Sequence, residues 1–132
     1  MTASAVGTIP YVVKVVRNYL VSVLDTGIVV ATKVPATRPA KLVIIDTAST
    51  GDVDNIALSL RRVIIQDYAK DEITSGELSE TIFGHLKSAK YVPGNGIRNV
   101  SVVGTPARFD DPDIPDVPRF QQTVDVLLRA VF

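Results

Sequence analysis

The chain has 132 residues, of which 46% are hydrophobic and 21% are charged. This size and composition indicate one folded domain, residues 1–132, and exclude a disordered chain or an enzyme with separate cofactor and substrate domains. Fourteen basic and fourteen acidic residues give a net charge of zero, which excludes the basic surface typical of nonspecific nucleic-acid binding.

The sequence contains no cysteine, so thiol catalysis, disulfide bonds and thiolate metal sites are excluded. No apolar segment reaches the roughly 18 residues that a membrane span needs. The first ten residues, MTASAVGTIP, lack the positive charge of a secretory signal. We therefore expect a soluble protein made in the cytoplasm, with a flexible start over residues 1–8.

Apolar residues at helical spacing predict an amphipathic helix over Ile9–Leu24, with Thr8 as its cap. The apolar stripe contains Val12, Val16, Tyr19 and Val23. Alternating apolar residues then predict a strand over Ile28–Val34. Because each proline lacks an amide donor, Pro35–Pro39 cannot continue this strand and is predicted to be a connection.

The segment Lys41–Thr47 is apolar on both faces, which predicts a central strand covered on each side. Polar and small residues over Ala48–Asn55 predict a loop. The residues that follow fit a helical stripe as well as a strand, but the β-branched run Val63–Ile65 favours a strand from about Leu60 to Tyr68.

Asp71 and Glu72 predict the start of a second helix, whose early acids and late lysines suit the helix dipole. Its predicted buried stripe contains Leu78, Ile82, Leu86 and Ala89. The segment Pro93–Gly96 ends this helix as a turn. The next strand is predicted over Ile97–Val103, and Thr105–Arg108 extends it past a glycine bend.

Asp110–Pro118, DDPDIPDVP, has four carboxylates and three prolines in nine residues, which predicts an extended acidic loop in solvent. A final strand begins at Arg119. One face of this strand is predicted to contain Phe120, Gln122, Val124, Val126, Leu128, Ala130 and Phe132. The resulting order of helix, three strands, helix and two strands predicts an α+β fold: a mostly antiparallel sheet of about five strands with both helices on one face.

Few residues suggest catalysis or ligand binding. His85 is the single histidine, so one chain cannot form a two-histidine metal site, and we expect a structural role for it. Gly94 and Gly96 lead into a strand rather than into the helix N-terminus that binds anions, so they indicate a turn. The acidic loop Asp110–Asp116 offers oxygen ligands for a cation, but its prolines favour a loop that faces a partner. We expect no cofactor and no metal.

Asp46 supports one enzymatic alternative. The segment VIIDTAST, Val43–Thr50, looks like the active-site turn of aspartic proteases, and VVGT, Val102–Thr105, looks like their downstream element. In a retropepsin-like homodimer, two copies of Asp46 would share one proton across a twofold axis. Ala48 stands where that family prefers glycine, and a helix is predicted in place of the flap. The non-enzymatic interpretation is that Asp46 ends a strand before a turn.

Two stretches of the sequence, taken together with the order in which they occur along the chain, resemble a known protein family. TKVPATRPAKLVIID, Thr32–Asp46, and VPRFQQTVDVLLRA, Val117–Ala130, look like signature regions of the tail terminator proteins of long-tailed, siphovirus-type bacteriophages. The resemblance also includes Tyr68 and Ala69, an aromatic residue followed by alanine at the end of the third strand, and it extends in order from Ile9 to Ala130.

The resemblance implies a structural, non-enzymatic virion protein of the tail and neck, assembled in the host cytoplasm. Such a protein forms a homohexameric ring that caps the tail tube, ends its polymerisation and joins the head-completion protein. DNA passes through the ring without specific binding, and no membrane is involved. The residues we expect at protein interfaces are Val34, Arg38, Arg119 and Gln121. Another neck or head-closure protein is an alternative with the same small α+β format.

Overall fold

The computed structural model describes residues 6–51 and 53–132. Within these residues, two α-helices, a short 3-10 helix and five strands follow the order α1, β1, β2, β3, α2, β4, β5. This confirms the predicted α+β element order. None of the described helices is long and apolar enough to cross a membrane. The flexible start predicted for residues 1–8 falls largely on residues 1–5, which lie outside the described part of the chain.

The five strands form one mixed sheet in the order β1-β2-β3-β5-β4. β1 (Val29–Ala31) runs parallel to β2 (Leu42–Ala48). The other neighbours are antiparallel, and they bring together β3 (Leu58–Tyr68), β5 (Arg119–Arg129) and β4 (Ile97–Arg108). Most of the sheet is therefore antiparallel, as predicted.

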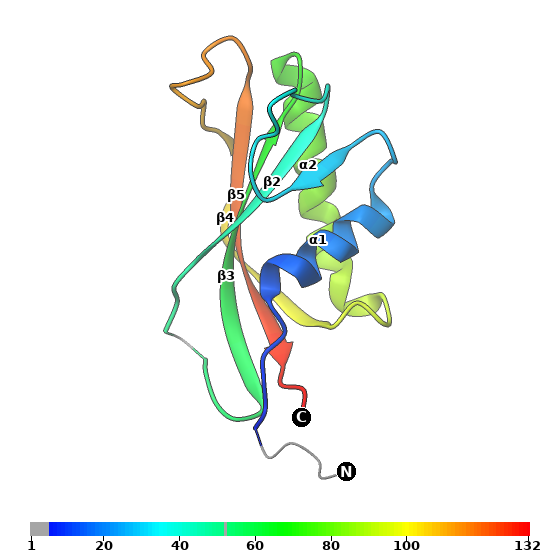
Figure 1. Cartoon of the computed structure of the whole chain (residues 1–132), viewed down its shortest axis with the longest axis vertical. Coiled ribbons are helices and arrows are strands. Elements are labelled where there is room, and N and C mark those ends of the chain that lie inside the picture. Colours follow the sequence, from blue (N-terminus) through cyan, green and yellow to red (C-terminus); the bar gives the residue numbers. More distant parts are fainter. Residues whose placement is uncertain (1–5, 52) are drawn as a thin grey trace.

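Both helices cover the same face of this sheet (Figure 1), which confirms the predicted layers. α1 (Val12–Val23) packs mainly on β1 and β2, and α2 (Glu72–Ser88) packs mainly on β4 and β5. We call this side the helix face and the other side the open face. The main core lies under the helices, and its fully buried members include Val16, Leu20, Val43, Val63, Ile65, Ile82, Leu86, Val124, Val126 and Leu128.

The first helix begins later than predicted, at Val12, and Thr8 does not cap it. Instead, Thr8 and Val131 form an antiparallel bridge with two backbone hydrogen bonds of 2.8 and 2.9 Å. The residue at the cap position, Tyr11, makes no capping hydrogen bond with its side chain. Backbone pairing with the distant C-terminus therefore replaces the local cap that the sequence suggested.

The first strand is shorter than its predicted range, Ile28–Val34, because pairing with β2 ends at Ala31. Val34 lies beyond the strand and is 37% exposed. β2 agrees with the prediction of a strand covered on both sides. Its first four residues are buried on alternating faces: Leu42, Val43, Ile44 and Ile45.

The second helix has the start and the buried stripe that the sequence predicts. The backbone N–H of Thr74 donates to Asp71 Oδ1 at 2.8 Å, and this hydrogen bond lowers the pKa of the Asp71 carboxyl. Beyond a 3-10 helix, Ala89–Tyr91, the chain turns at Gly94 and Gly96. Their φ angles of 86° and 82° confirm a turn that glycine adopts without strain.

β4 contains the predicted extension to Arg108, with register shifts on both sides of Gly104. β5 has the predicted alternation: its buried helix-face residues include Gln122, Val124, Val126 and Leu128. Phe132 was predicted to continue this face of the strand, but it lies beyond the end of β5 and is exposed. Two residues after the strand ends at Arg129, Val131 pairs with Thr8.

Candidate functional site

Arg119 is the centre of a polar cluster on the open face, where β3 ends and β5 begins. Although arginine is usually exposed, this side chain is only 8% exposed. Its Nε donates to the carbonyl oxygen of Phe109 at 2.7 Å, and its Nη1 lies 3.7 Å from Asp111 Oδ2. The guanidinium also lies 5.3 Å from the centre of the Phe109 ring. Arg119 is thus bound into its own chain.

Tyr68 links this arginine to the connection between β1 and β2, residues 32–41, which we call the β1–β2 segment. The guanidinium groups of Arg38 and Arg119 lie 5.9 and 6.0 Å from the centre of its ring. The Tyr68 hydroxyl donates to Asp111 Oδ2 at 3.3 Å. We call Arg38, Tyr68, Asp111 and Arg119 the tyrosine cluster. It connects the end of β3, the β1–β2 segment and the acidic loop, and so holds these surface segments in one arrangement.

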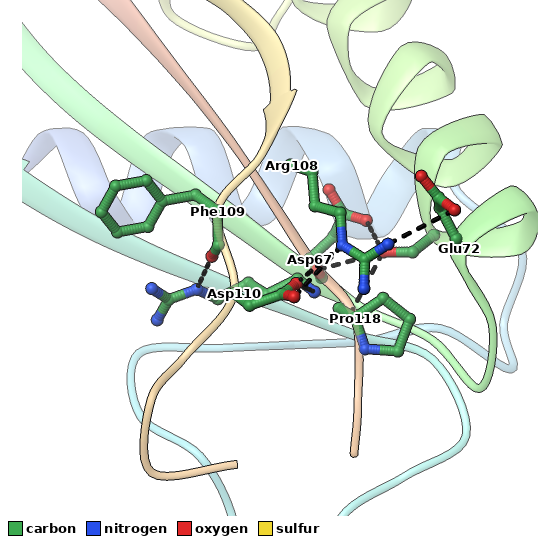
Figure 2. Close-up of polar contacts among 8 residues, drawn as sticks. Asp67, Glu72, Arg108, Phe109, Asp110 and Pro118 are labelled. Atoms are coloured by element: carbon green, nitrogen blue, oxygen red, sulfur yellow. Dashed lines mark hydrogen bonds and ion pairs between the residues drawn. The ribbon is translucent and has the colours of Figure 1, made fainter. Parts of the chain in front are cut away.

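Arg108 forms a second, more exposed set of ion pairs beside this cluster (Figure 2). Its guanidinium is 3.3 Å from Glu72 Oε2 at the start of α2 and 3.1 Å from Asp110 Oδ1. Arg108 lowers the pKa of the Asp110 carboxyl through this hydrogen bond. Because these side chains are largely exposed, solvent screens the pairs and they stabilise the fold little.

The acidic loop is anchored on one side and exposed on the other. Ile114 and Val117 pack against the small open-face core of Leu42, Ile44 and Tyr68. The prediction that the whole loop lies in solvent was therefore wrong for these two residues. Asp113 and Asp116 remain exposed. Within residues 6–51 and 53–132, no group of three or more carboxylate or histidine side chains could hold a metal ion.

A different polar cluster lies under α2 on the helix face, around Asp67 (Figure 2). Asp67 is fully buried, and the Ser75 hydroxyl donates to its Oδ2 at 3.0 Å. Burial raises the pKa of Asp67 to about 7, although hydrogen bonds from the Ser79 and Ser75 hydroxyls oppose this rise. The carboxyl is therefore largely neutral in mildly acidic solution.

Gln122 lies on the same face and extends this buried cluster. Its Nε2 donates to the carbonyl oxygen of Ser79 at 2.9 Å. Among the described residues, Gln122 Oε1 and Asp67 Oδ1 find no hydrogen-bond donor. A proton on Asp67 adds a donor to a region with an excess of acceptors, which agrees with its raised pKa.

The residues predicted to lie at interfaces are placed in different surroundings. Arg38 and Arg119 meet at Tyr68 in the tyrosine cluster. Gln121 lies on the open face, where its Oε1 accepts a 2.8 Å hydrogen bond from Gln66 Nε2. Val34 is exposed in the β1–β2 segment. The structure therefore brings together the two arginines but not the other two residues.

Asp46, the residue of the enzymatic alternative, lies inside β2 rather than in a turn. Its backbone is opposite Ile64 in β3, and its exposed carboxylate accepts a 2.8 Å hydrogen bond from the amide of Thr47. His85 is half-buried on α2, and its carbonyl oxygen accepts a 2.7 Å hydrogen bond from the Tyr19 hydroxyl.

Sequence reasoning did not single out Asp67 as a functional or structural site. Its only signal was a carboxylate at a position of β3 that continues the buried alternation of Val63 and Ile65. That signal identifies a buried acid only when the face of the strand is already known.

Several exposed apolar residues belong to chain segments that lie at the end of the sheet near the C-terminus (Figure 1). The backbone joins these segments: Thr8 pairs with Val131, and the amide of Ala130 donates to the carbonyl oxygen of Ala57 at 2.8 Å. We call the four exposed residues here the end patch: Val6, Ile56, Val131 and Phe132. The acidic loop lies at the opposite end of the molecule.

Comparison of the sequence with models of known protein families finds no match. Comparison with curated proteins also finds none.

Proposed function

We propose that this chain is a tail terminator subunit of a long-tailed bacteriophage, which forms a ring, caps the tail tube and joins the tail to the neck. The resemblance of Thr32–Asp46 and Val117–Ala130 to that family supports this proposal, as does the α+β element order. The end patch carries it, because exposed apolar side chains gathered at one end of a domain favour contact with another protein.

The two ends of the molecule suit two different partners. The end patch is apolar, whereas the opposite end carries the carboxylates of the acidic loop. A ring of such subunits, with their long axes along the ring axis, has one apolar rim and one acidic rim. We assign the apolar rim to the tail tube and the acidic rim to the neck protein. The tyrosine cluster supports this role because it holds the acidic loop in place before any partner binds.

Electron microscopy of negatively stained samples tests the proposal, using the purified chain alone and mixed with polymerised tail tubes of the same virion. We expect rings, and tubes closed at one end by a ring. Ile56→Asp should abolish tube capping, because Ile56 is 77% exposed in the end patch. Tyr91→Asp is the matched control, since Tyr91 is 76% exposed but belongs to the 3-10 helix after α2. Monomers that never bind tube ends would overturn the proposal.

Two alternatives predict other results in the same samples. A head-closure or other neck protein would bind the head side and leave tube ends bare. An aspartic protease would cleave an acidic peptide substrate at low pH, would bind a pepstatin-type inhibitor and would lose activity in Asp46→Ala. Asp46 lies within a strand instead of the active-site turn that this alternative requires, so no observation favours it.

A further inference from the structure

The zero net charge of this chain conceals two oppositely charged segments. Between Asp25 and Asp46 the chain has no acid but three basic residues, which are Lys33, Arg38 and Lys41. From Asp71 to Leu86 it has no lysine or arginine but four acids, which are Asp71, Glu72, Glu77 and Glu80. The first segment forms the β1–β2 connection, and the second forms most of α2.

The acidic segment borders an apolar groove of about 460 Å³ between α2 and β5. Ile73 and Phe120 line it, and Ile73 is 70% exposed. Gly76 leaves space for the aromatic ring, because a Cβ at this position would lie 3.2 Å from Phe120 Cζ. The acids on its border are Glu72, Glu77 and Glu80. Such a groove fits a segment that has an apolar side chain between cations.

The β1–β2 segment has that pattern. Val34 is exposed, Lys33 precedes it and Lys41 follows it, and both lysines are exposed. Pro35 and Pro39 restrict the backbone between them, which reduces the entropy lost when the segment binds. The contact of Arg38 with Tyr68 restrains the segment further.

The groove and the β1–β2 segment lie at opposite edges of the sheet, so they do not contact each other within one chain. β1 forms one edge, and α2 packs mainly on β5 and β4 at the other edge. In the described part of the chain, no ion pair joins Lys33 or Lys41 to the acids of α2. Two complementary surfaces on opposite sides of one molecule form a head-to-tail contact between copies, which closes into a ring when the rotation allows.

We propose that the β1–β2 segment of one copy binds in the α2 groove of the next copy. Val34 then contacts Ile73 and Phe120, while the two lysines face the glutamates at the groove border. This inference rests on the proposed ring, for which it supplies the contact between subunits. It also predicts that assembly weakens as salt is raised, because salt screens attraction between exposed charges.

Charge reversal at exposed positions tests this contact by sedimentation velocity. We expect Glu77→Lys with Glu80→Lys, and separately Lys33→Glu with Lys41→Glu, to raise the protein concentration needed for assembly by at least about tenfold. Asp113→Lys with Asp116→Lys is the matched control, since it makes the same charge change in the acidic loop and should leave assembly unchanged. Far-UV circular dichroism verifies that every variant is folded.

Mixing the two reversed proteins makes the test specific. Each reversed protein repels its own copies, but its altered surface complements the altered surface of the other. An equimolar mixture should therefore assemble at nearly the wild-type concentration, with the two proteins alternating in rings of even number. The inference would be overturned if both charge-reversed proteins assembled at the wild-type concentration. It would also be overturned if their equimolar mixture stayed monomeric.

This experiment separates the inference from the proposed function. Rings that assemble normally despite both reversals and still cap tail tubes would reject the α2 groove contact and keep the terminator proposal. Rings that are lost in each charge-reversed protein and restored in the mixture, but that never bind tubes, would support the contact and reject the terminator proposal. A wild-type chain that is monomeric at all concentrations would overturn the contact.

Discussion

The two faces of the sheet bury aspartates in opposite ways. On the helix face, Asp67 is fully buried without a cation, and burial raises its pKa to about 7. On the open face, Asp125 is 4% exposed and accepts two hydrogen bonds from Arg62, of 2.9 and 3.0 Å. One carboxyl is stabilised by keeping its proton and the other by a paired charge.

The difference follows from what covers each face. The helix α2, packed on the sheet, places the hydroxyls of Ser75 and Ser79 in hydrogen bonds with Asp67. No helix of residues 6–51 and 53–132 covers the open face, so the long side chain of Arg62 can lie along it with its guanidinium partly in water. Burial under a helix thus makes stability depend on pH, whereas burial beside an arginine makes it depend on an ion pair.

The largest effect on stability is expected from Tyr68, the central residue of the tyrosine cluster on the open face. Because the ring is almost fully buried, Tyr68→Ala should lower the free energy of unfolding by about 4 kcal/mol, measured by urea denaturation. It should also release the acidic loop, seen as faster amide exchange at Ile114 and Val117. Tyr68→Phe is the control, since it keeps the ring and loses only the hydroxyl, which donates to Asp111 and accepts from Arg119 Nη1. Equal stability of the alanine variant and the wild type would contradict this role.

A slightly smaller effect is expected from pH, through Asp67. The folded protein keeps this proton up to about pH 7, whereas the unfolded chain releases it near pH 3.8, the ordinary pKa of an aspartate. Folded molecules therefore bind more protons between these values, and the free energy of unfolding falls as pH rises. We expect a loss of roughly 3 kcal/mol between pH 5 and pH 8.

Asp67→Asn isolates this contribution, because asparagine is neutral and close in shape to the protonated acid. Its unfolding free energy should change much less between the two pH values than that of the wild type. The same pH dependence in both proteins would show that Asp67 does not carry it.

The smallest effect is expected from the ion pair of Arg62 and Asp125. Asp125→Asn should cost roughly 1 to 2 kcal/mol in urea denaturation, because Arg62 is 31% exposed and water replaces part of the lost interaction. Arg108→Ala is the matched control: its ion pairs are more exposed, and its removal should produce no measurable change. A greater loss from Arg108→Ala than from Asp125→Asn would reverse this ranking.

Local patterns were sufficient for the elements whose partners are close in sequence. Asp71 and Thr74 form a cap within one turn, and Gly94 and Gly96 form a turn within three residues. The order of elements, the strand β5 and the buried stripe of α2 were predicted for the same reason. Each depends on periodicity or on contacts a few residues apart.

Other predictions depended on partners that sequence spacing does not reveal. Thr8 pairs with Val131 instead of capping α1, and β1 ends at Ala31, where its pairing with β2 stops. Arg119 looks like an exposed cation at the start of a strand, but it is buried because Tyr68, Phe109 and Asp111 surround it. In each case the competing partner is many residues away along the chain.

The amino-acid order alone was enough to establish an α+β domain, its helices and strands in sequence, and the positions of its turns, because these arise from short-range sterics and hydrophobic periodicity. Folding in three dimensions settled which acid lies under a helix, which arginine is buried and which charged segments lie at opposite edges of the sheet. Burial and electrostatic pairing depend on strand register and on the covering layer, and both are produced by contacts between distant parts of the chain.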